Sequence, residues 1–197
     1  MKTATQSSLL QQLLFEEYVT QFGPRVGQFV REQQAWAEAL DLALHYEALP
    51  FPPVKRRQIG FRAAYALEHA YFAQPEAFTP YVPDFVKAFP QAQHPSVHRH
   101  FCKILSDLCR CKAVKLSSEE AQNIAEACLD WLIAPKERIA VKVWAVEILL
   151  MLCEDVNWLP EILPQALQGL AEDSSPGMKV RLRRWREQWC VCRLGNC

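Results

Sequence analysis

The stretch RIAVKVWAVEILLMLC, from Arg138 to Cys153, decides how the rest of the chain is interpreted. Thirteen of its sixteen residues are apolar, and only Arg138, Lys142 and Glu147 interrupt them. A helix of this composition is apolar almost all the way round and must be covered on several sides. A membrane span would need roughly 20 apolar residues in a row, and Lys142 and Glu147 fall inside this run. The stretch therefore predicts the central helix of a soluble protein.

Length and composition favour one helical domain over residues 1–197. The 22 Lys and Arg residues equal the 22 Asp and Glu residues, so no bulk field attracts nucleic acid or an anionic membrane. Six glycines and thirteen prolines, with few runs of Val, Ile and Thr, favour helices separated by Pro-containing turns. The first residues lack the apolar core of a secretory signal, so we expect a cytoplasmic protein with mostly reduced cysteines.

Prolines and capping residues divide the chain into successive helices. A first helix starts at Ser7 or Ser8 and ends near Gly23-Pro24, which makes residues 1–24 an N-terminal capping helix. A second helical region covers about 26–48 and stops at the prolines that follow. Ser117 and Glu120 have capping-box spacing. The other expected helices lie within residues 55–72, 75–89, 94–109, 117–134, 135–152, 157–172 and 174–190.

A pattern repeats in the helices that follow a short Pro-containing turn. GFRAAYAL, SVHRHFCKIL, AVKVWAVEIL and KVRLRRWREQW superpose with a basic residue near the start, at Arg62, Arg99, Lys142 and Arg181. The spacings between these residues are 37, 43 and 39. A period of about 40 residues with two helices per unit is typical of HEAT or armadillo arrays.

The chain resembles the HEAT-repeat superfamily, in which the second helix of each pair opens with a Val-Arg-like dipeptide. The matching residues are Val141-Lys142, Val180-Arg181, Phe61-Arg62 and, with one residue inserted, Val97-His98-Arg99. The helices AAYALEHA and VHRHFCKIL are also similar to those of small bacterial HEAT-repeat proteins. The resemblance covers about Ala35 to Trp189. It implies an all-α fold, a right-handed α-α superhelix of about four helix pairs, with a basic C-terminal cap and Cys-rich tail at 174–197.

Basic residues gather in the opening turns of the second helices, which the resemblance places on the concave face. One interpretation is a non-enzymatic scaffold that binds an acidic protein partner through Arg62, Arg99, Lys142, Arg181 and Arg184. The other is that these cations join adjacent repeats, by bonding to carbonyls at helix ends or to acids. The acids in question are Glu68, Asp107, Glu147 and Glu187.

A nucleic-acid-binding function is the second hypothesis. The HEAT-like alkylpurine DNA glycosylases resemble this chain in length and helical repetition, and they place aromatic residues beside a carboxylate on the concave face. The corresponding candidates here are Trp144, Trp185, Trp189, Asp130-Trp131 and Glu147. Trp131 and Trp144 also occupy apolar-stripe positions, which predicts that they belong to the core.

Histidine and cysteine clusters raise a third hypothesis, a thiol or zinc site. His98 and Cys102 share a helix face at i, i+4, and three thiols lie in the tail at Cys190, Cys192 and Cys197. Zinc requires four ligands, usually with paired C-x-x-C spacing, so cysteines used as small apolar fillers are the alternative. The sequence contains no G-x-S-x-G elbow, Gly-rich phosphate loop or H-E-x-x-H. We therefore expect no catalytic residue, no cofactor and no resident metal.

Overall fold

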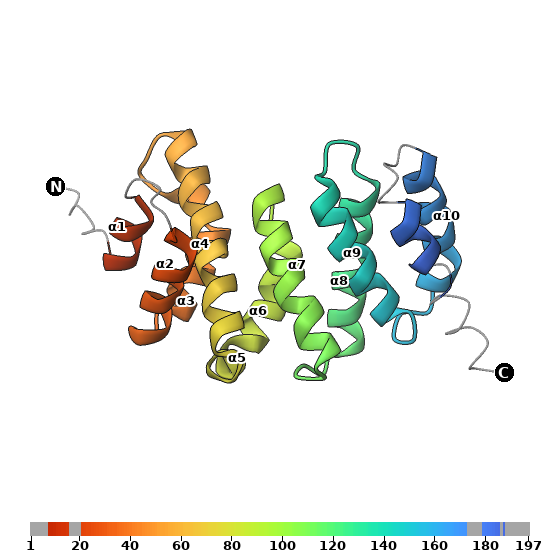
Figure 1. Ribbon diagram of the computed structural model, residues 1–197, viewed down its shortest axis with the longest axis horizontal. Helices are drawn as coiled ribbons and strands as arrows, with labels where there is room; N and C mark the ends of the chain where they lie inside the picture. Colours follow the sequence, from red (N-terminus) through yellow and green to blue (C-terminus); the bar gives the residue numbers. More distant parts are fainter. Residues whose placement is uncertain (1–7, 16–20, 173–178, 186, 188–197) are drawn as a thin grey trace. The chain divides into compact units, whose positions relative to one another are not determined.

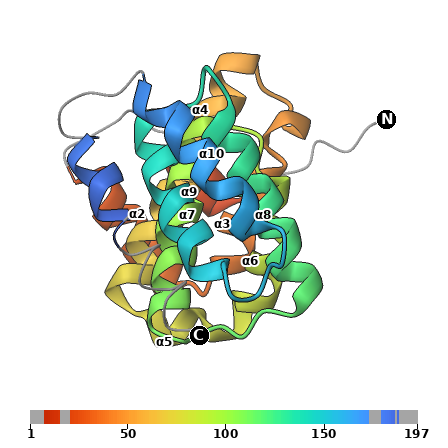
Figure 2. The same ribbon diagram turned by 90° about the vertical axis from the view of Figure 1, so that its right-hand side faces the viewer.

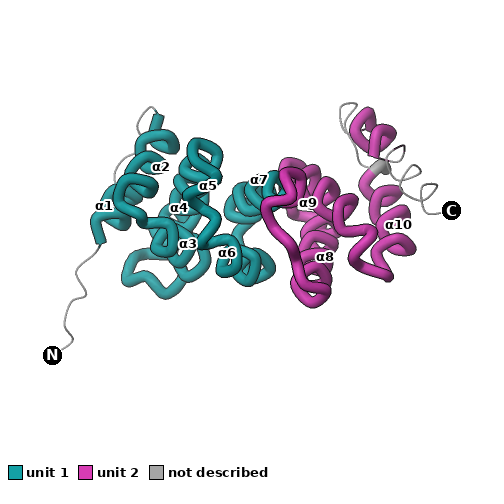
Figure 3. The backbone as a smooth tube through the Cα atoms, turned by 90° about the horizontal axis from the view of Figure 1, so that it is seen from below, with its two compact units in different colours: residues 1–108 teal, residues 109–197 magenta. Residues whose placement is uncertain are grey.

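The computed structural model describes residues 8–15, 21–172, 179–185 and 187 of the chain. These residues form α-helices and short 3-10 helices and contain no β-strand, so the all-α prediction is confirmed. Figure 1 labels the helices in chain order. The chain divides into two compact units, Met1–Leu108 (unit 1) and Cys109–Cys197 (unit 2), which are coloured separately in Figure 3.

Unit 1 is built around one long helix, α4 (Pro53–Ala73), which packs against the three helices before it. Pro53 occupies the first turn of α4, where its missing N–H has no intrahelical acceptor to lose. The other elements of unit 1 are α1 (Leu9–Phe15), α2 (Phe22–Glu32), α3 (Trp36–Leu44), η1 (Tyr46–Ala48), α5 (Pro75–Phe78), η2 (Thr79–Tyr81), α6 (Val82–Ala88), η3 (Phe89–Gln91) and α7 (Pro95–Arg110).

Buried aromatic rings fill the core of unit 1. Phe78 lies 5.5 Å from Trp36, 5.6 Å from Tyr71 and 5.6 Å from Phe85, measured between ring centres. Phe85 in turn lies 5.1 Å from Phe101 on α7. These five rings join α3, α4, α5, α6 and α7 in one apolar cluster, and edge-to-face pairs add to the burial of their area.

The first two predicted helices have wrong boundaries. Gly23 and Pro24 do not end a helix but lie in the first turn of α2, where proline is tolerated. Gly23 is needed there because a Cβ would lie 2.5 Å from the His69 ring of α4. The region 26–48 is not one helix either. It breaks after Glu32, and Gln34 adopts a left-handed conformation with φ of 53° before α3 begins.

Unit 2 contains α8 (Ser118–Ile133), α9 (Ile139–Leu152), α10 (Leu159–Glu172) and a short helix at residues 179–185. The apolar stretch from Arg138 to Cys153 contains α9, which packs against α8 and α10 (Figure 2). Residues on several sides of α9 are buried, including Val141, Ile148 and Leu149, as its composition predicts. Among the described helices, none has the length and apolar content that a membrane span needs.

A capping box starts α8, as the sequence predicts. The Ser117 hydroxyl accepts a hydrogen bond from the Glu120 amide at 3.2 Å, and the Glu120 carboxylate accepts one from the Ser117 amide at 2.8 Å. We expect Ser117→Ala to lower the free energy of unfolding by about 1 kcal/mol, because an orphan amide of the first turn loses its acceptor. Urea unfolding measures this effect. Ser118→Ala is the control and should change stability by less than about 0.5 kcal/mol, since Ser118 is exposed.

Candidate functional site

The predicted binding residues differ in exposure. Arg62 and Arg99 belong to unit 1, and Lys142, Arg181 and Arg184 belong to unit 2. Arg99, Arg181 and Arg184 are exposed, whereas only 2% of Arg62 and 9% of Lys142 is accessible to solvent. Positions that are equivalent in the repeat pattern therefore have different surroundings, and only the three exposed arginines can meet a partner's surface directly.

Arg62 of α4 supports the end of α1. Its Nη1 donates a hydrogen bond to the Leu14 carbonyl oxygen at 2.8 Å, and its guanidinium carbon lies 4.9 Å from the ring centre of Phe22. Leu14 lies in the last turn of α1, so this hydrogen bond joins α4 to the end of α1. The bond agrees with the interpretation that the repeated cations join adjacent helices by bonding to carbonyls at helix ends.

The helix at residues 179–185 presents the densest exposed group of cations in unit 2. Leu182 and Trp185 are buried and anchor it, and the Trp185 Nε1–H donates a hydrogen bond to Glu147 Oε1 of α9 at 2.9 Å. Residues 179–181, 183 and 184 of this helix face solvent. We call the exposed cations of this helix the basic helix surface: Lys179, Arg181, Arg183 and Arg184.

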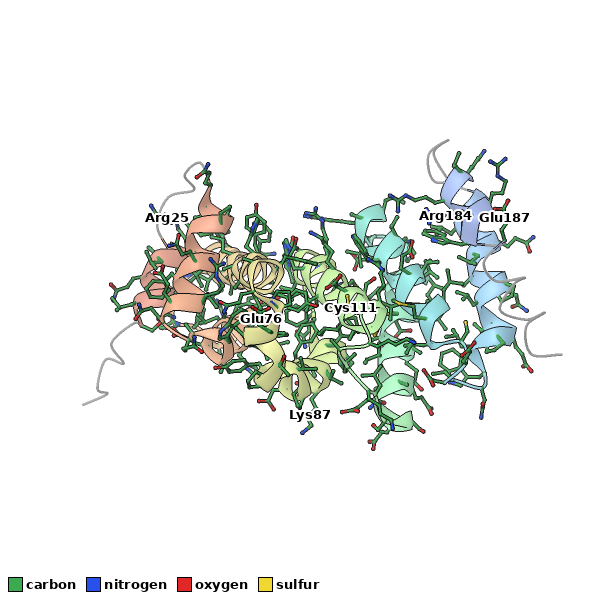
Figure 4. The ribbon with its side chains drawn as sticks, turned by 60° about the horizontal axis from the view of Figure 1, so that its bottom comes forward. Arg25, Glu76, Lys87, Cys111, Arg184 and Glu187 are labelled. Carbon is green, nitrogen blue, oxygen red and sulfur yellow. The ribbon has the colours of Figure 1, made fainter. Side chains whose placement is uncertain are left out.

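One carboxylate accompanies the basic helix surface. Arg183 and Glu187 form an exposed ion pair with a distance of 4.0 Å, and Arg184 and Glu187 are labelled in Figure 4. Within the described residues, neither Arg181 nor Arg184 forms a hydrogen bond or an ion pair. Planar guanidinium groups in this state can each bind a carboxylate through two parallel hydrogen bonds. The arrangement can therefore bind anions.

The acids expected to pair with the repeated cations bond to other groups instead. Each of them makes a contact within its own unit that stabilises packing between or along helices. The contacts are Glu68 with His100 and Lys103, Asp107 with Tyr71, Glu147 with Trp185, and Glu187 with Arg183.

Among the described residues, the aromatic side chains proposed for a glycosylase-like pocket do not form an open site. Trp185 is buried and donates its indole hydrogen bond to Glu147, so these two candidates are bonded to each other. Trp131 is buried on α8, as its apolar-stripe position predicts, and Trp144 is half-buried. Trp189 lies outside the described residues.

A buried polar cluster in unit 1 was not predicted. Glu68 of α4 accepts hydrogen bonds from His100 and Lys103 of α7, one through each carboxylate oxygen. His100 is 1% accessible at its side chain and packs against the rings of Phe61 and Tyr65, with centre distances of 5.6 Å and 5.3 Å. Its Nε2 is buried and has no hydrogen-bond partner. The sequence signal was a carboxylate inside the Ala-rich helix AAYALEHA.

The hydrogen bonds and charges around Glu68 favour its ionised form. Burial by itself would raise the pKa of Glu68, but the hydrogen bonds and charges of His100 and Lys103 outweigh it and hold that pKa below its ordinary value. Burial lowers the pKa of the neighbouring His69. Glu68 is therefore an anion bound by two donors, and its role is to join α4 to α7.

The His and Cys candidates for a metal site do not converge. His98 Nε2 is bonded to the Ala92 carbonyl at 2.9 Å, and Cys102 is fully buried. In the part of the chain that the structure describes, no group of three or more His, Cys, Asp or Glu side chains could hold a metal ion. Burial raises the pKa of the Cys109 thiol to about 11, so this thiol stays protonated. The tail cysteines Cys190, Cys192 and Cys197 lie outside the described residues.

Comparison with known proteins gives one match. A family model described as a HEAT repeat domain matches residues 54–188, which include every helix from α5 to α10 and nearly all of α4. No curated protein and no solved structure gives a significant match to the chain.

Proposed function

Because this chain belongs to the HEAT repeat family, whose repeats generally serve as protein-interaction scaffolds, we propose that it is a non-enzymatic scaffold for an acidic protein partner. The observation that supports the proposal most strongly is the basic helix surface, where Arg181 and Arg184 are exposed and, within the described residues, unpaired. Arg99 is a second exposed guanidinium, in unit 1, that a partner could contact. Lys142 is only 9% accessible, and Arg62 is buried and bonded to α1, so neither belongs to this exposed binding surface.

The charge distribution favours a protein partner with a local acidic segment. The whole chain has no net charge, so attraction must come from the basic helix surface at short range and must weaken as salt screens it. Val180, which is 61% exposed, adds an apolar contact among the cations, and protein segments with acidic and apolar residues complement such a surface. Trp185 is buried and bonded to Glu147, so within the described residues it does not present a free ring for stacking on a nucleobase.

We propose a cytoplasmic location for this scaffold. Five cysteines in the described residues are present as thiols and not as disulfides. The cytoplasm maintains thiols in this state.

Reversing the charge of Arg181 and Arg184 tests the proposal. We expect the Arg181→Glu/Arg184→Glu double variant to bind a labelled Asp- and Glu-rich peptide about tenfold more weakly, because two exposed charge contacts of somewhat under 1 kcal/mol each are lost. Fluorescence anisotropy over a salt titration measures the affinity. Lys112→Glu/Lys115→Glu is the matched control, since it changes the net charge equally at two exposed lysines of unit 2.

Three results would contradict the proposal. An equal loss in the control variant would mean that the peptide senses net charge and not the basic helix surface. Tight, salt-dependent binding of duplex or single-stranded DNA, with little binding of the acidic peptide, would favour a nucleic-acid-binding function. Absence of peptide binding even at low salt would exclude an acidic partner for this surface.

A further inference from the structure

Unit 2 contains an open apolar groove that is lined by residues other than those of the basic helix surface. It lies between the end of α8, the first turn of α9 and the C-terminal half of α10, and its volume is about 600 Å³. Its walls include Leu132, Ile133, Ile139 and Leu170. Ile133 is 59% exposed and Ile139 is 54% exposed, so two large aliphatic side chains at the groove are in contact with water. Grooves of this size and lining are typical of binding sites.

One ammonium group lies in this groove without a counter-charge. Lys142 lines it and is 9% accessible, and within the described residues its side chain forms no hydrogen bond and no ion pair. The groove's carboxylate, on Glu137, accepts a hydrogen bond from the Arg138 amide at 2.8 Å instead. A carboxylate beside this ammonium would accept a charge-assisted hydrogen bond, and the surrounding apolar side chains would strengthen the pair by lowering the local dielectric constant. The groove is therefore complementary to an apolar ligand that carries one carboxylate.

Gly169 of α10 keeps the groove open. A Cβ built at this position would meet no atom within 4 Å, so no packing contact in the described residues requires a glycine there. Glycine inside a helix is less favourable than alanine, because it loses more backbone entropy on folding. The missing side chain leaves space along the lining of the groove, where a bound segment can approach the α10 backbone.

We propose that this groove binds an apolar segment of a partner protein, with one Asp or Glu side chain of that segment paired to Lys142. The inference rests on the proposed scaffold function but uses a surface other than the basic helix surface. An amphipathic helix laid in a groove uses apolar residues at i, i+3, i+4 and i+7, and an acidic residue among them would reach the Lys142 ammonium. Partner specificity would then come from the combination of apolar side chains and one carboxylate.

Peptide selection on the whole chain tests this inference without a known partner. A displayed library of random peptides of about twelve residues, long enough for i to i+7 anchors, is selected on the wild-type protein. Enriched peptides are synthesised with a fluorescent label and titrated against Gly169→Phe, whose added ring would fill the groove. Gln168→Phe is the matched control, because Gln168 is the adjacent exposed residue of α10 and does not line the groove. Circular dichroism confirms that each variant is folded.

A double-mutant cycle, in which acid and amide forms of a peptide are compared on the wild type and on Lys142→Met, tests whether a peptide carboxylate pairs with Lys142. For peptides that Gly169→Phe weakens, we expect at least one Asp or Glu, and replacing that acid with its amide should weaken binding about tenfold to the wild type. Against Lys142→Met the acid and amide forms of the peptide should bind equally. Ile133→Ser/Ile139→Ser supplies a second variant that weakens binding without filling the groove.

The selection also separates this inference from the proposed function. If Arg181→Glu/Arg184→Glu weakened every enriched peptide and Gly169→Phe weakened none, the result would support the basic helix surface alone and overturn the groove. The groove is also overturned if Gly169→Phe weakens no peptide, or if the acid and amide peptides bind the wild type equally. Concentration-dependent dimerisation of the wild type that Gly169→Phe abolishes would identify a second copy of the chain as the occupant, which also overturns it.

Discussion

Glu68→Gln is expected to lower the free energy of unfolding by about 3 kcal/mol, at the lower end of the cost of breaking a buried charge pair. The carboxylate is 6% accessible and is the hydrogen-bond acceptor for both His100 and Lys103. Glutamine keeps the shape but removes the charge, and its amide group presents a donor where one of the two donors of α7 needs an acceptor. The loss follows from leaving buried donors unpaired.

Urea unfolding measures this loss, and hydrogen exchange in α4 and α7 assigns it to unit 1. The control is Glu47→Gln, because Glu47 is an exposed carboxylate that forms an ion pair with Arg56 at 3.7 Å. Exposed pairs contribute about 0–1 kcal/mol, so the control should change stability little. Equal effects of the two substitutions would show that the buried cluster has no special role in joining α4 to α7.

The effect of Glu68→Gln should depend on pH. The folded-state pKa of Glu68 lies below the ordinary value of 4.5, so the unfolded chain takes up this proton first as the pH falls. The contribution of the Glu68 carboxylate to the free energy of unfolding is complete above the pKa of Glu68 in the unfolded chain. It is lost as the pH falls through the pKa of Glu68 in the folded protein. The stabilities of the wild type and Glu68→Gln should therefore converge in acid. The charge of Glu68 raises the pKa of His69 against the lowering by burial, so the titration of His69 differs between the two proteins and contributes to the pH dependence of the comparison.

Most of the helices could be predicted because their signals are local. Pro75 and the Ser117 capping box start helices in the structure as in the sequence, and the apolar composition of residues 138–153 predicts the central position of α9 in unit 2. Pro53 was assigned to the linker but occupies the first turn of α4, where proline is tolerated. The break between α2 and α3 was missed because it occurs at Gln34, which adopts a left-handed conformation. Glycine and asparagine are the usual sequence signals for that conformation, and neither is present at this turn. Tertiary packing determines that turn.

The candidate site could be predicted only in part, because exposure depends on neighbours that the repeat pattern does not specify. Arg62 and Arg99 occupy equivalent positions, but α1 and Phe22 cover Arg62 whereas Arg99 faces solvent. Glu68 is separated from His100 and Lys103 by 32 and 35 residues. Nothing in the helix AAYALEHA indicates which side chains of a later helix will meet its carboxylate.

Arg62→Met is expected to lower the free energy of unfolding by about 3 kcal/mol. A hydrogen bond from a charged donor contributes roughly 1.5–3 kcal/mol, and the stacking of the guanidinium on Phe22 contributes about 0.5–2 kcal/mol. Methionine retains part of the apolar packing but leaves the Leu14 carbonyl without this donor. Exchange of the α1 amides should accelerate most, because that carbonyl lies in the last turn of α1.

Arg99→Met is the matched control for this substitution. Arg99 is exposed at the equivalent repeat position, and within the described residues it forms no hydrogen bond or ion pair, so its replacement should cost less than about 0.5 kcal/mol. The pair of variants decides between the two interpretations of the repeated cations. If Arg62→Met left stability unchanged and instead reduced binding of the acidic peptide, Arg62 would belong to the partner-binding surface and its bond to α1 would be incidental. We expect only Arg62→Met to lose stability. That result would mean that Arg62 holds helices together and that any binding of a partner uses the exposed arginines.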